Sequence, residues 1–295
     1  MENNIFKSHY AAALNLGIPN ISYVLAPYLK DNMPEEYTVS SQNQRHKVKR
    51  RKFHLCTLDL PRNAVIIVNG VEQAGPEMVF LQLANDLHIQ DLILLGMQMC
   101  SHKVGESLRA VTNTKKLAKF LNKTKWHRGH RKAMRALKYI KDGAANIEES
   151  FVYMRICLPH ALGGYGFRDP VLNAQIEVKN KANTVVKEKN FYPDFYFKYV
   201  KTGIEYDSFQ THSDAKSQSK DAVRANVLAM QGVKTISLKT EQFYNTDEFK
   251  DFILVHAPLF KRRIQIRCKK FDDMYDRLHS RLPRRSNQVP KKRVS

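Results

Sequence analysis

The sequence lacks any apolar run near the ~18 residues that a membrane span requires. Leu92–Cys100 is far too short for this role. Tyr10–Leu16, near the N-terminus, has neither the charged lead nor the cleavage site of a signal peptide. We therefore expect an intracellular, cytoplasmic protein that makes no membrane contact.

Cysteine is scarce and scattered. The four cysteines form no C-x-x-C pair and have no closely spaced histidine partners. They are Cys56, Cys100, Cys157 and Cys268. This spacing indicates neither a disulfide framework nor a zinc finger.

Acidic residues are also few relative to basic ones. The 295 residues include 28 Asp and Glu against 49 Lys and Arg, for a net charge of +21. Hydrophobic residues nevertheless make up 43% and aromatic residues 10%, values typical of a folded protein, so a wholly disordered chain is excluded. At roughly 100–200 residues per domain, the length fits one elaborated domain or two smaller ones.

The positive charge is concentrated in three blocks. Arg45–Lys52 holds six basic residues and Lys115–Lys141 holds eleven, both without an acid, and residues 261–295 hold thirteen against three acids. Such clusters attract phosphate backbones through Coulomb attraction and counterion release. Within the central block the predicted nucleic-acid contacts are Lys115, Lys116, Lys123, Lys125, Arg128, Arg131, Lys132 and Arg135. A solvated surface is the alternative for these blocks, and a disordered tail for the last ten residues.

The first half predicts a small mixed α/β domain. Ala64–Val68 is typical of a buried strand before an Asn-Gly turn, Pro76 opens a predicted helix, and Leu92–Met99 is a second one. The central basic block predicts one or two helices that face Trp126, Met134, Leu137 and Ile140 inward. Residues 1–44 carry no chemical motif.

From residue 145 the pattern predicts a helix, two or three strands, a helix and a strand. Glu148–Leu158 is largely apolar and ends before a proline. Phe191–Lys198 and Gly203–Ser208 flank a turn and predict a β-hairpin. Val223, Val227 and Met230 lie at helical spacing, Gly232 is expected to cap that helix, and Val233–Leu238 predicts the return strand.

Three carboxylates fall on the predicted hairpin. Glu205 and Asp207 share one face of their strand, and a hairpin partner can bring Asp194 beside them. Carboxylates held this close repel one another unless a cation such as Mg²⁺ (or Mn²⁺) neutralises them, and such an ion can activate water and clamp a phosphodiester. A solvated strand face is the alternative, but these acids lie in otherwise apolar and aromatic strands.

Residues Pro193–Leu238 resemble the PD-(D/E)xK nuclease superfamily, and more closely its very-short-patch-repair (Vsr) endonuclease-like branch. The matching residues are Glu149 on the helix, Asp194, Glu205 with Asp207, His212, Asp221 with Arg224, and Gly232. The resemblance implies a restriction-endonuclease-like α/β core in residues 145–260, preceded by a mixed N-terminal domain in 1–144 and followed by a basic tail in 261–295. Leu55–Cys100 is weakly similar to the AbiEi-type antitoxins of phage-defence systems, which implies a protein partner from a defence or toxin–antitoxin system.

The family pattern also assigns roles. It implies that Glu149, Asp194 and Glu205 hold Mg²⁺, that Asp207 supports or shares this site, and that His212 assists proton transfer. Ser208 stands where the family usually has glycine, His212 lies one residue further from Asp207 than usual, and the lysine of the superfamily name is absent because Asp207 takes its position. A neutral imidazole can substitute as the proton acceptor.

Several alternatives stay open at this point. Glu148 can replace Glu149, and His212 can be an ordinary surface residue. Asp221 and Arg224 can form an ion pair that docks their helix. Lys198 and Lys201 are either phosphate contacts or solvated lysines.

Three functions follow from the sequence. The first is a metal-dependent endonuclease that hydrolyses DNA phosphodiester bonds, in phage defence or DNA repair. The second is a non-catalytic, antitoxin-like DNA-binding regulator with a degenerate nuclease fold. The third, an RNA-binding protein, has no RRM-like aromatic signature to support it.

Overall fold

The computed structural model describes residues 5–177, 190–207 and 225–283. Within these ranges the protein is a mixed α/β protein that divides into two compact units, residues 1–150 and 151–295. The boundary falls inside a helix, α7 (Ile147–Cys157), six residues after the boundary expected at 144. None of the helices in the described ranges combines the length and the hydropathy of a membrane span.

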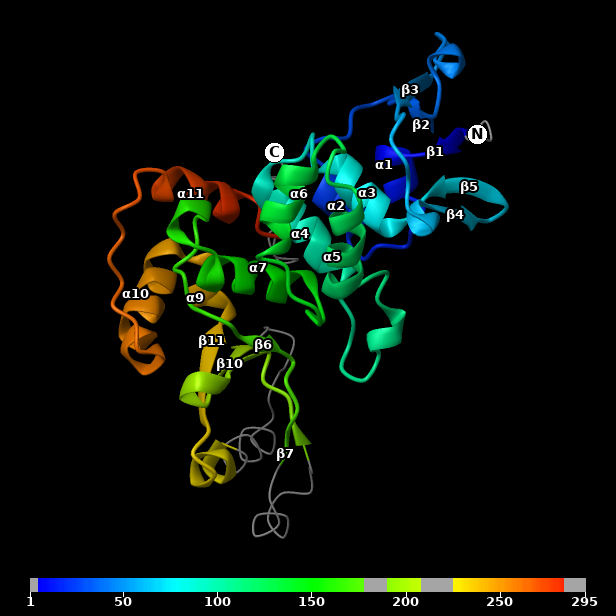
Figure 1. Cartoon of the computed structure of the whole chain (residues 1–295). Helices are drawn as coiled ribbons and strands as arrows, with labels where there is room; N and C mark the ends of the chain where they lie inside the picture. The colour runs from blue at the N-terminus through cyan, green and yellow to red at the C-terminus, as the bar shows by residue number, and fades with distance from the viewer. Residues whose placement is uncertain (1–4, 178–189, 208–224, 284–295) are drawn as a thin grey trace, which may run out of the picture. The chain divides into compact units, whose positions relative to one another are not determined.

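The first unit begins with a five-stranded mixed sheet (Figure 1). Its strands are β1 (Ile5–Lys7), β2 (Glu35–Val39), β3 (Arg51–Leu55), β4 (Val65–Val68) and β5 (Val71–Ala74). They are ordered β3-β2-β1-β5-β4, with β1 antiparallel to β2 and parallel to β5. The hairpin β4–β5 turns at Asn69 and Gly70, both with positive φ, as an Asn-Gly hairpin turn requires. The predicted strand is therefore confirmed, but it is not buried, because Ile67 is largely exposed.

Helices form the rest of the first unit. They are α1 (His9–Ala13), α2 (Ile21–Leu25), α3 (Pro76–Leu83), α4 (Ile89–Met99), α5 (Thr114–Lys123) and α6 (His130–Leu137). Every residue of α4 is buried, including the polar Gln90, Asp91 and Gln98 among its apolar side chains. The amphipathic helix α5 packs on α3 and α6 on α4, so these two helices place their charged faces in solvent.

The structure corrects one detail of the basic block. Ile140 is buried as expected and Met134 and Leu137 are partly buried, but Trp126 is 88% exposed. Trp126 lies in the turn between α5 and α6 rather than on either helix, so the helical spacing that predicted an inward ring does not apply to it.

The second unit contains a four-stranded mixed sheet with the order β11-β10-β9-β6. Its strands are β6 (Val171–Leu172), β9 (Phe195–Phe197), β10 (Thr202–Asp207) and β11 (Lys234–Lys239), and a separate pair is β7 (Ile176–Glu177) with β8 (Asn190–Phe191). The β9–β10 pair is the predicted hairpin, and β11 is the predicted return strand, parallel to β10.

A glycine ends the helix that precedes β11. Residues 225–230 are helical, and Gly232 has φ +74°. Its N–H donates to the Ala229 carbonyl at 2.9 Å, and the Val233 N–H donates to the Leu228 carbonyl at 2.9 Å. This pair of hydrogen bonds is the Schellman motif and confirms the predicted cap. Of the residues placed at helical spacing, Val227 is buried and Met230 is 86% exposed.

The remaining helices of the second unit follow the sheet. They are α9 (Thr240–Tyr244), α10 (Thr246–His256) and α11 (Phe271–Ser280). Helix α11 lies in the segment expected to be a basic tail, and its Phe271, Tyr275 and Leu278 are buried. An aromatic cluster that includes Phe243 and Phe249 surrounds the fully buried guanidinium of Arg155 on α7, which donates hydrogen bonds to the Phe243 carbonyl and the Tyr275 hydroxyl.

Candidate functional site

The hairpin β9–β10 carries the acids that the sequence singled out. All three residues of β9 are aromatic, which favours an extended strand, and Lys201, with φ +47°, reverses the chain before β10. The register pairs Phe195 with Ile204, both buried. Asp194, one residue before β9, therefore lies level with the C-terminal half of β10.

A hydrogen bond fixes Asp194 in this place. Its Oδ2 accepts the backbone N–H of Tyr206 at 2.7 Å, and its own carbonyl accepts the N–H of Asn173 at 3.0 Å. Tyr206 is the residue between Glu205 and Asp207, so the expectation that the hairpin brings Asp194 beside these two residues is met. Asp194 and Glu205 are half-buried.

Asp207 is the exposed acid of the three, and it faces a cation. Lys239 Nζ lies 3.6 Å from Asp207 Oδ2, and the Asp207 carbonyl accepts a hydrogen bond from the Thr240 hydroxyl at 2.8 Å. Parallel pairing places Lys239 directly opposite Asp207. Sequence reasoning missed Lys239, because its neighbour on β10 is known only once the strands are paired.

Carboxylate oxygens of the kind found on this hairpin are the ligands that a hard divalent cation takes. Among the residues that the structure describes, no group of three His, Cys, Asp or Glu side chains is placed to hold a metal ion. Mg²⁺ is commonly held by one or two carboxylates, with water and substrate phosphate as its other ligands. Asp194 and Glu205 meet this requirement in donor chemistry.

Glu149 belongs to the first unit and caps its own helix. Its carboxylate accepts the N–H of Ala145 at 2.8 Å and the side-chain amide of Asn146 at 2.9 Å, and its N–H donates to Asn146 Oδ1 at 2.7 Å. It is only 5% exposed, whereas Glu148 is half-buried. The reciprocal bonds with Asn146 resemble a capping box and give Glu149 a structural role at the start of α7.

Three residues of the implied site cannot be placed. His212, Asp221 and Arg224 lie outside the described residues.

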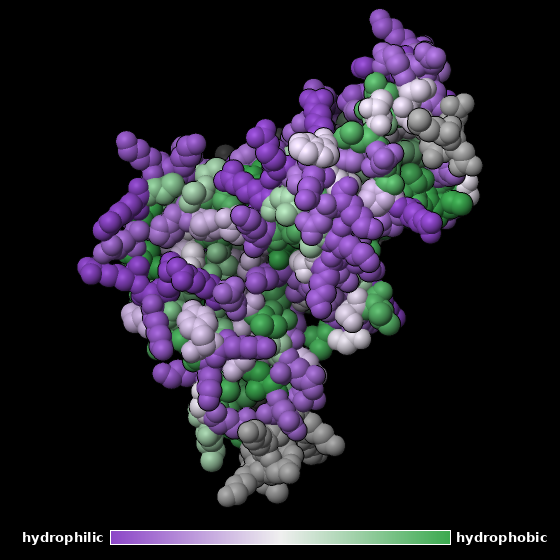
Figure 2. All heavy atoms as spheres, in the orientation of Figure 1, coloured by the Kyte–Doolittle hydropathy of each residue, from purple (hydrophilic) through white to green (hydrophobic). Residues whose placement is uncertain are grey.

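The predicted nucleic-acid contacts lie on α5, α6 and the turn between them. Seven of the eight are exposed; Lys132 is half-buried, and burial lowers the pKa of its ammonium. Arg128 Nε donates to Asn85 Oδ1 at 3.1 Å. Hydrophilic side chains predominate on the surface over these two helices (Figure 2). The buried positions of α5 are Leu117, Phe120 and Leu121, so its lysines are left to face solvent.

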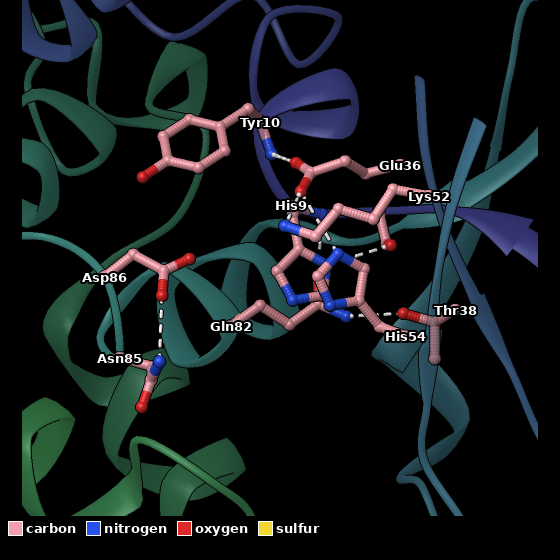
Figure 3. A network of polar contacts seen from close by, with 10 residues as sticks. His9, Tyr10, Glu36, Thr38, Lys52, His54, Gln82, Asn85 and Asp86 are labelled. Atoms are coloured by element: carbon pink, nitrogen blue, oxygen red, sulfur yellow. Dashed lines mark hydrogen bonds and ion pairs between the residues drawn. The ribbon is translucent and has the colours of Figure 1, made fainter. Parts of the chain in front are cut away.

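A second polar cluster in the first unit was not expected from the sequence. Figure 3 shows the carboxylate of Glu36 above two stacked imidazoles, His9 and His54, whose centroids are 3.6 Å apart. Glu36 Oε1 lies 3.1 Å from both Lys52 Nζ and His54 Nε2, and its Oε2 accepts the Tyr10 N–H at 3.0 Å. The acid and the histidines are far apart in the sequence, and only the pairing of β2 with β3 brings Glu36 beside Lys52.

Comparison with known proteins adds no further constraint: the chain matches no family model, no curated protein and no solved structure.

Proposed function

We propose that this protein is a metal-dependent endonuclease that hydrolyses DNA phosphodiester bonds. The observation that supports it most is the 2.7 Å hydrogen bond from the Tyr206 N–H to Asp194, which sets two half-buried carboxylates at one end of a β-hairpin. Two carboxylates side by side on a hairpin supply oxygen ligands of the kind that Mg²⁺ takes.

Asp194 and Glu205 would hold the Mg²⁺ in this proposal. When bound, the ion would activate a water molecule and neutralise charge on the scissile phosphate. Lys239, beside Asp207, would place a positive charge at the rim of the site, where it can bind a neighbouring phosphate. His212 remains the proposed proton acceptor.

The first unit would bind the DNA backbone. Its exposed lysines and arginines on α5 and α6 belong to a stretch of 27 residues, Lys115–Lys141, that contains no acid. Cations on two packed helices keep a fixed spacing, and neutralisation of several phosphates at once releases counterions.

A second candidate is a DNA-binding regulator whose nuclease fold is no longer catalytic. It is favoured by the ion pair between Asp207 and Lys239 and by the capping role of Glu149, because both acids then stabilise the fold. Binding of DNA is common to the two candidates, and only cleavage separates them.

The test is plasmid nicking by the purified chain with Mg²⁺ or Mn²⁺. Loss of a residue that merely orients a metal ligand costs about 10- to 100-fold, so we expect Glu205→Gln to lower the nicking rate by about 100-fold or more. The matched control is Glu241→Gln, an exposed acid on α9, which should retain the wild-type rate. Absence of nicking by the wild type, with salt-sensitive DNA binding intact, would favour the regulator.

A further inference from the structure

We propose that Trp126 is a stacking platform for an unpaired DNA base, so that the basic surface of the first unit selects DNA with single-stranded character. This inference rests on the proposed DNA-binding function and adds the class of substrate. It is carried by the exposure of the ring, the construction of the turn that presents it, and the charge around it.

Trp126 is exposed although its large apolar side chain would gain much from burial. An indole buries about 150–250 Å² of apolar surface in a core, which makes tryptophan one of the side chains that gains most from burial. Trp126 is the only tryptophan in the chain, yet it is 88% exposed. The next residue, His127, has both ring nitrogens buried. The turn therefore buries the ring nitrogens of His127 and leaves the apolar ring of Trp126 in solvent.

The turn that carries Trp126 is held by consecutive hydrogen bonds. The His127 N–H donates to the Thr124 carbonyl at 3.1 Å, and the His130 N–H donates to the His127 carbonyl at 3.1 Å. The Thr124 hydroxyl in turn donates to the Phe120 carbonyl at 3.2 Å, and His130 Nε2 lies 3.0 Å from the Leu121 carbonyl. The backbone on either side of Trp126 is thus fixed to the end of α5.

Gly129 anchors the other end of the turn. It has φ +86°, and a Cβ there would lie 2.7 Å from the Leu81 carbonyl oxygen. This close approach brings the turn against α3, and Arg128 is tied to Asn85 just beyond that helix. A ring on such a support loses little backbone freedom when a ligand stacks on it, which favours binding.

The basic residues next to Trp126 in the sequence indicate which class of ligand the ring binds. Three exposed cations flank Trp126 in the sequence: Lys123, Lys125 and Arg128. Cations that follow a phosphate backbone, combined with an aromatic face on which bases stack, are the two elements of single-strand binding. In an intact duplex neighbouring base pairs cover the faces of each base, so the indole can stack only on a base that is unpaired or at an end.

The single tryptophan makes the test direct, because all indole fluorescence reports on residue 126. We expect a 20-nucleotide oligo(dT) to quench this fluorescence on binding, and a blunt 20-base-pair dA·dT duplex to quench it much less. Alanine substitution at a stacking aromatic weakens binding by about 5- to 100-fold, so Trp126→Ala should bind oligo(dT) less tightly by that factor. Its affinity for the duplex should change less than about two-fold.

Two variants complete the design. Trp126→Phe should restore much of the oligo(dT) affinity, because it keeps an aromatic face. Leu108→Ala removes another apolar side chain of the first unit, 99% exposed, and should bind like the wild type. Unchanged oligo(dT) affinity in Trp126→Ala would overturn the inference, and so would quenching confined to oligo(rU). In either case, salt-sensitive binding to the duplex would still support the proposed DNA-binding function. Failure to bind either DNA would overturn both.

Discussion

At the scale of single residues, the most unusual electrostatics lie in the cluster around Glu36. Burial by itself would raise the pKa of this carboxyl. The hydrogen bond from His54, the attraction to His9 when that ring is protonated in acid, and the hydrogen bond from Lys52 together lower the pKa to about 2. Burial, followed by repulsion from His54, lowers the pKa of His9 to about 3. The cluster is therefore built for an ionised acid and a neutral His9.

This arrangement predicts that acid destabilises the first unit. His9 in the unfolded chain takes up its proton near pH 6.5 and in the folded unit only near pH 3, so its stabilising contribution is complete above 6.5 and is lost as the pH falls towards 3. The contribution of Glu36 is complete above pH 4.5 and is lost towards pH 2. The two losses have the same sign, and between pH 6.5 and 4.5 the loss from His9 alone reaches up to about 3 kcal/mol, at about 1.4 kcal/mol per pH unit.

Thermal unfolding of the whole chain between pH 7.5 and 4.5 checks this prediction. We expect His9→Asn to weaken the pH dependence of the unfolding transition of the first unit, because asparagine does not titrate. Asparagine also tolerates the positive φ of 50° at this position, so the backbone should be kept. His46→Asn, which removes an exposed histidine of the same unit, should keep the wild-type dependence. Identical pH profiles for the wild type and His9→Asn would contradict the role given to this ring.

At the scale of elements, turn and capping residues in the sequence correctly predicted where several helices and turns begin or end. The Asn69-Gly70 turn, the proline that opens α3 and Gly232 after the helix at 225–230 all lie where the backbone requires those residues. Contacts between distant segments were not predictable in this way. The pairing of Lys239 with Asp207 depends on a parallel register across a connection of 26 residues, 208–233, and the burial of Arg155 depends on three helices that arrive later in the chain.

Gly163 packs so closely on the backbone of α11 that the methyl group of an alanine would not fit between them. It has φ +78°, and a Cβ there would meet the backbone of α11 at 2.5 Å from Met274 C and O and 2.6 Å from Tyr275 N. Gly232 has a similar φ of +74°, but nothing lies within 4 Å of its Cβ position. Substitution of Gly232 would therefore add backbone strain alone, whereas substitution of Gly163 would add both backbone strain and a steric clash with α11.

We therefore expect Gly163→Ala to destabilise the second unit by roughly 3–4 kcal/mol, the sum of the strain at positive φ and the displacement of α11. Gly232→Ala should cost only about 1 kcal/mol. The free energy of unfolding in urea measures both values. Equal losses for the two variants would show that α11 does not pack on Gly163 in solution.

At the scale of the whole molecule, the chain separates two kinds of chemistry. The acid-free basic block lies on α5 and α6 in the first unit, and the hairpin acids lie in the second. Composition predicted the first feature, because clustered charge is visible in a sequence. The acids were predicted by strand periodicity and by the resemblance to nucleases. Neither signal could predict that Glu149 caps α7 or that Asp207 pairs with Lys239.

Calorimetric titration of Mn²⁺ into the purified full-length protein tests most directly whether the hairpin holds a metal. Asp194→Asn is the decisive variant, because asparagine Oδ1 can still accept the Tyr206 N–H while the negative charge is gone. We predict that the wild type and Glu241→Gln bind Mn²⁺ alike and that Asp194→Asn binds it at least about ten-fold more weakly. Equal Mn²⁺ affinity in Asp194→Asn, or no binding by the wild type, would contradict a metal site on this hairpin.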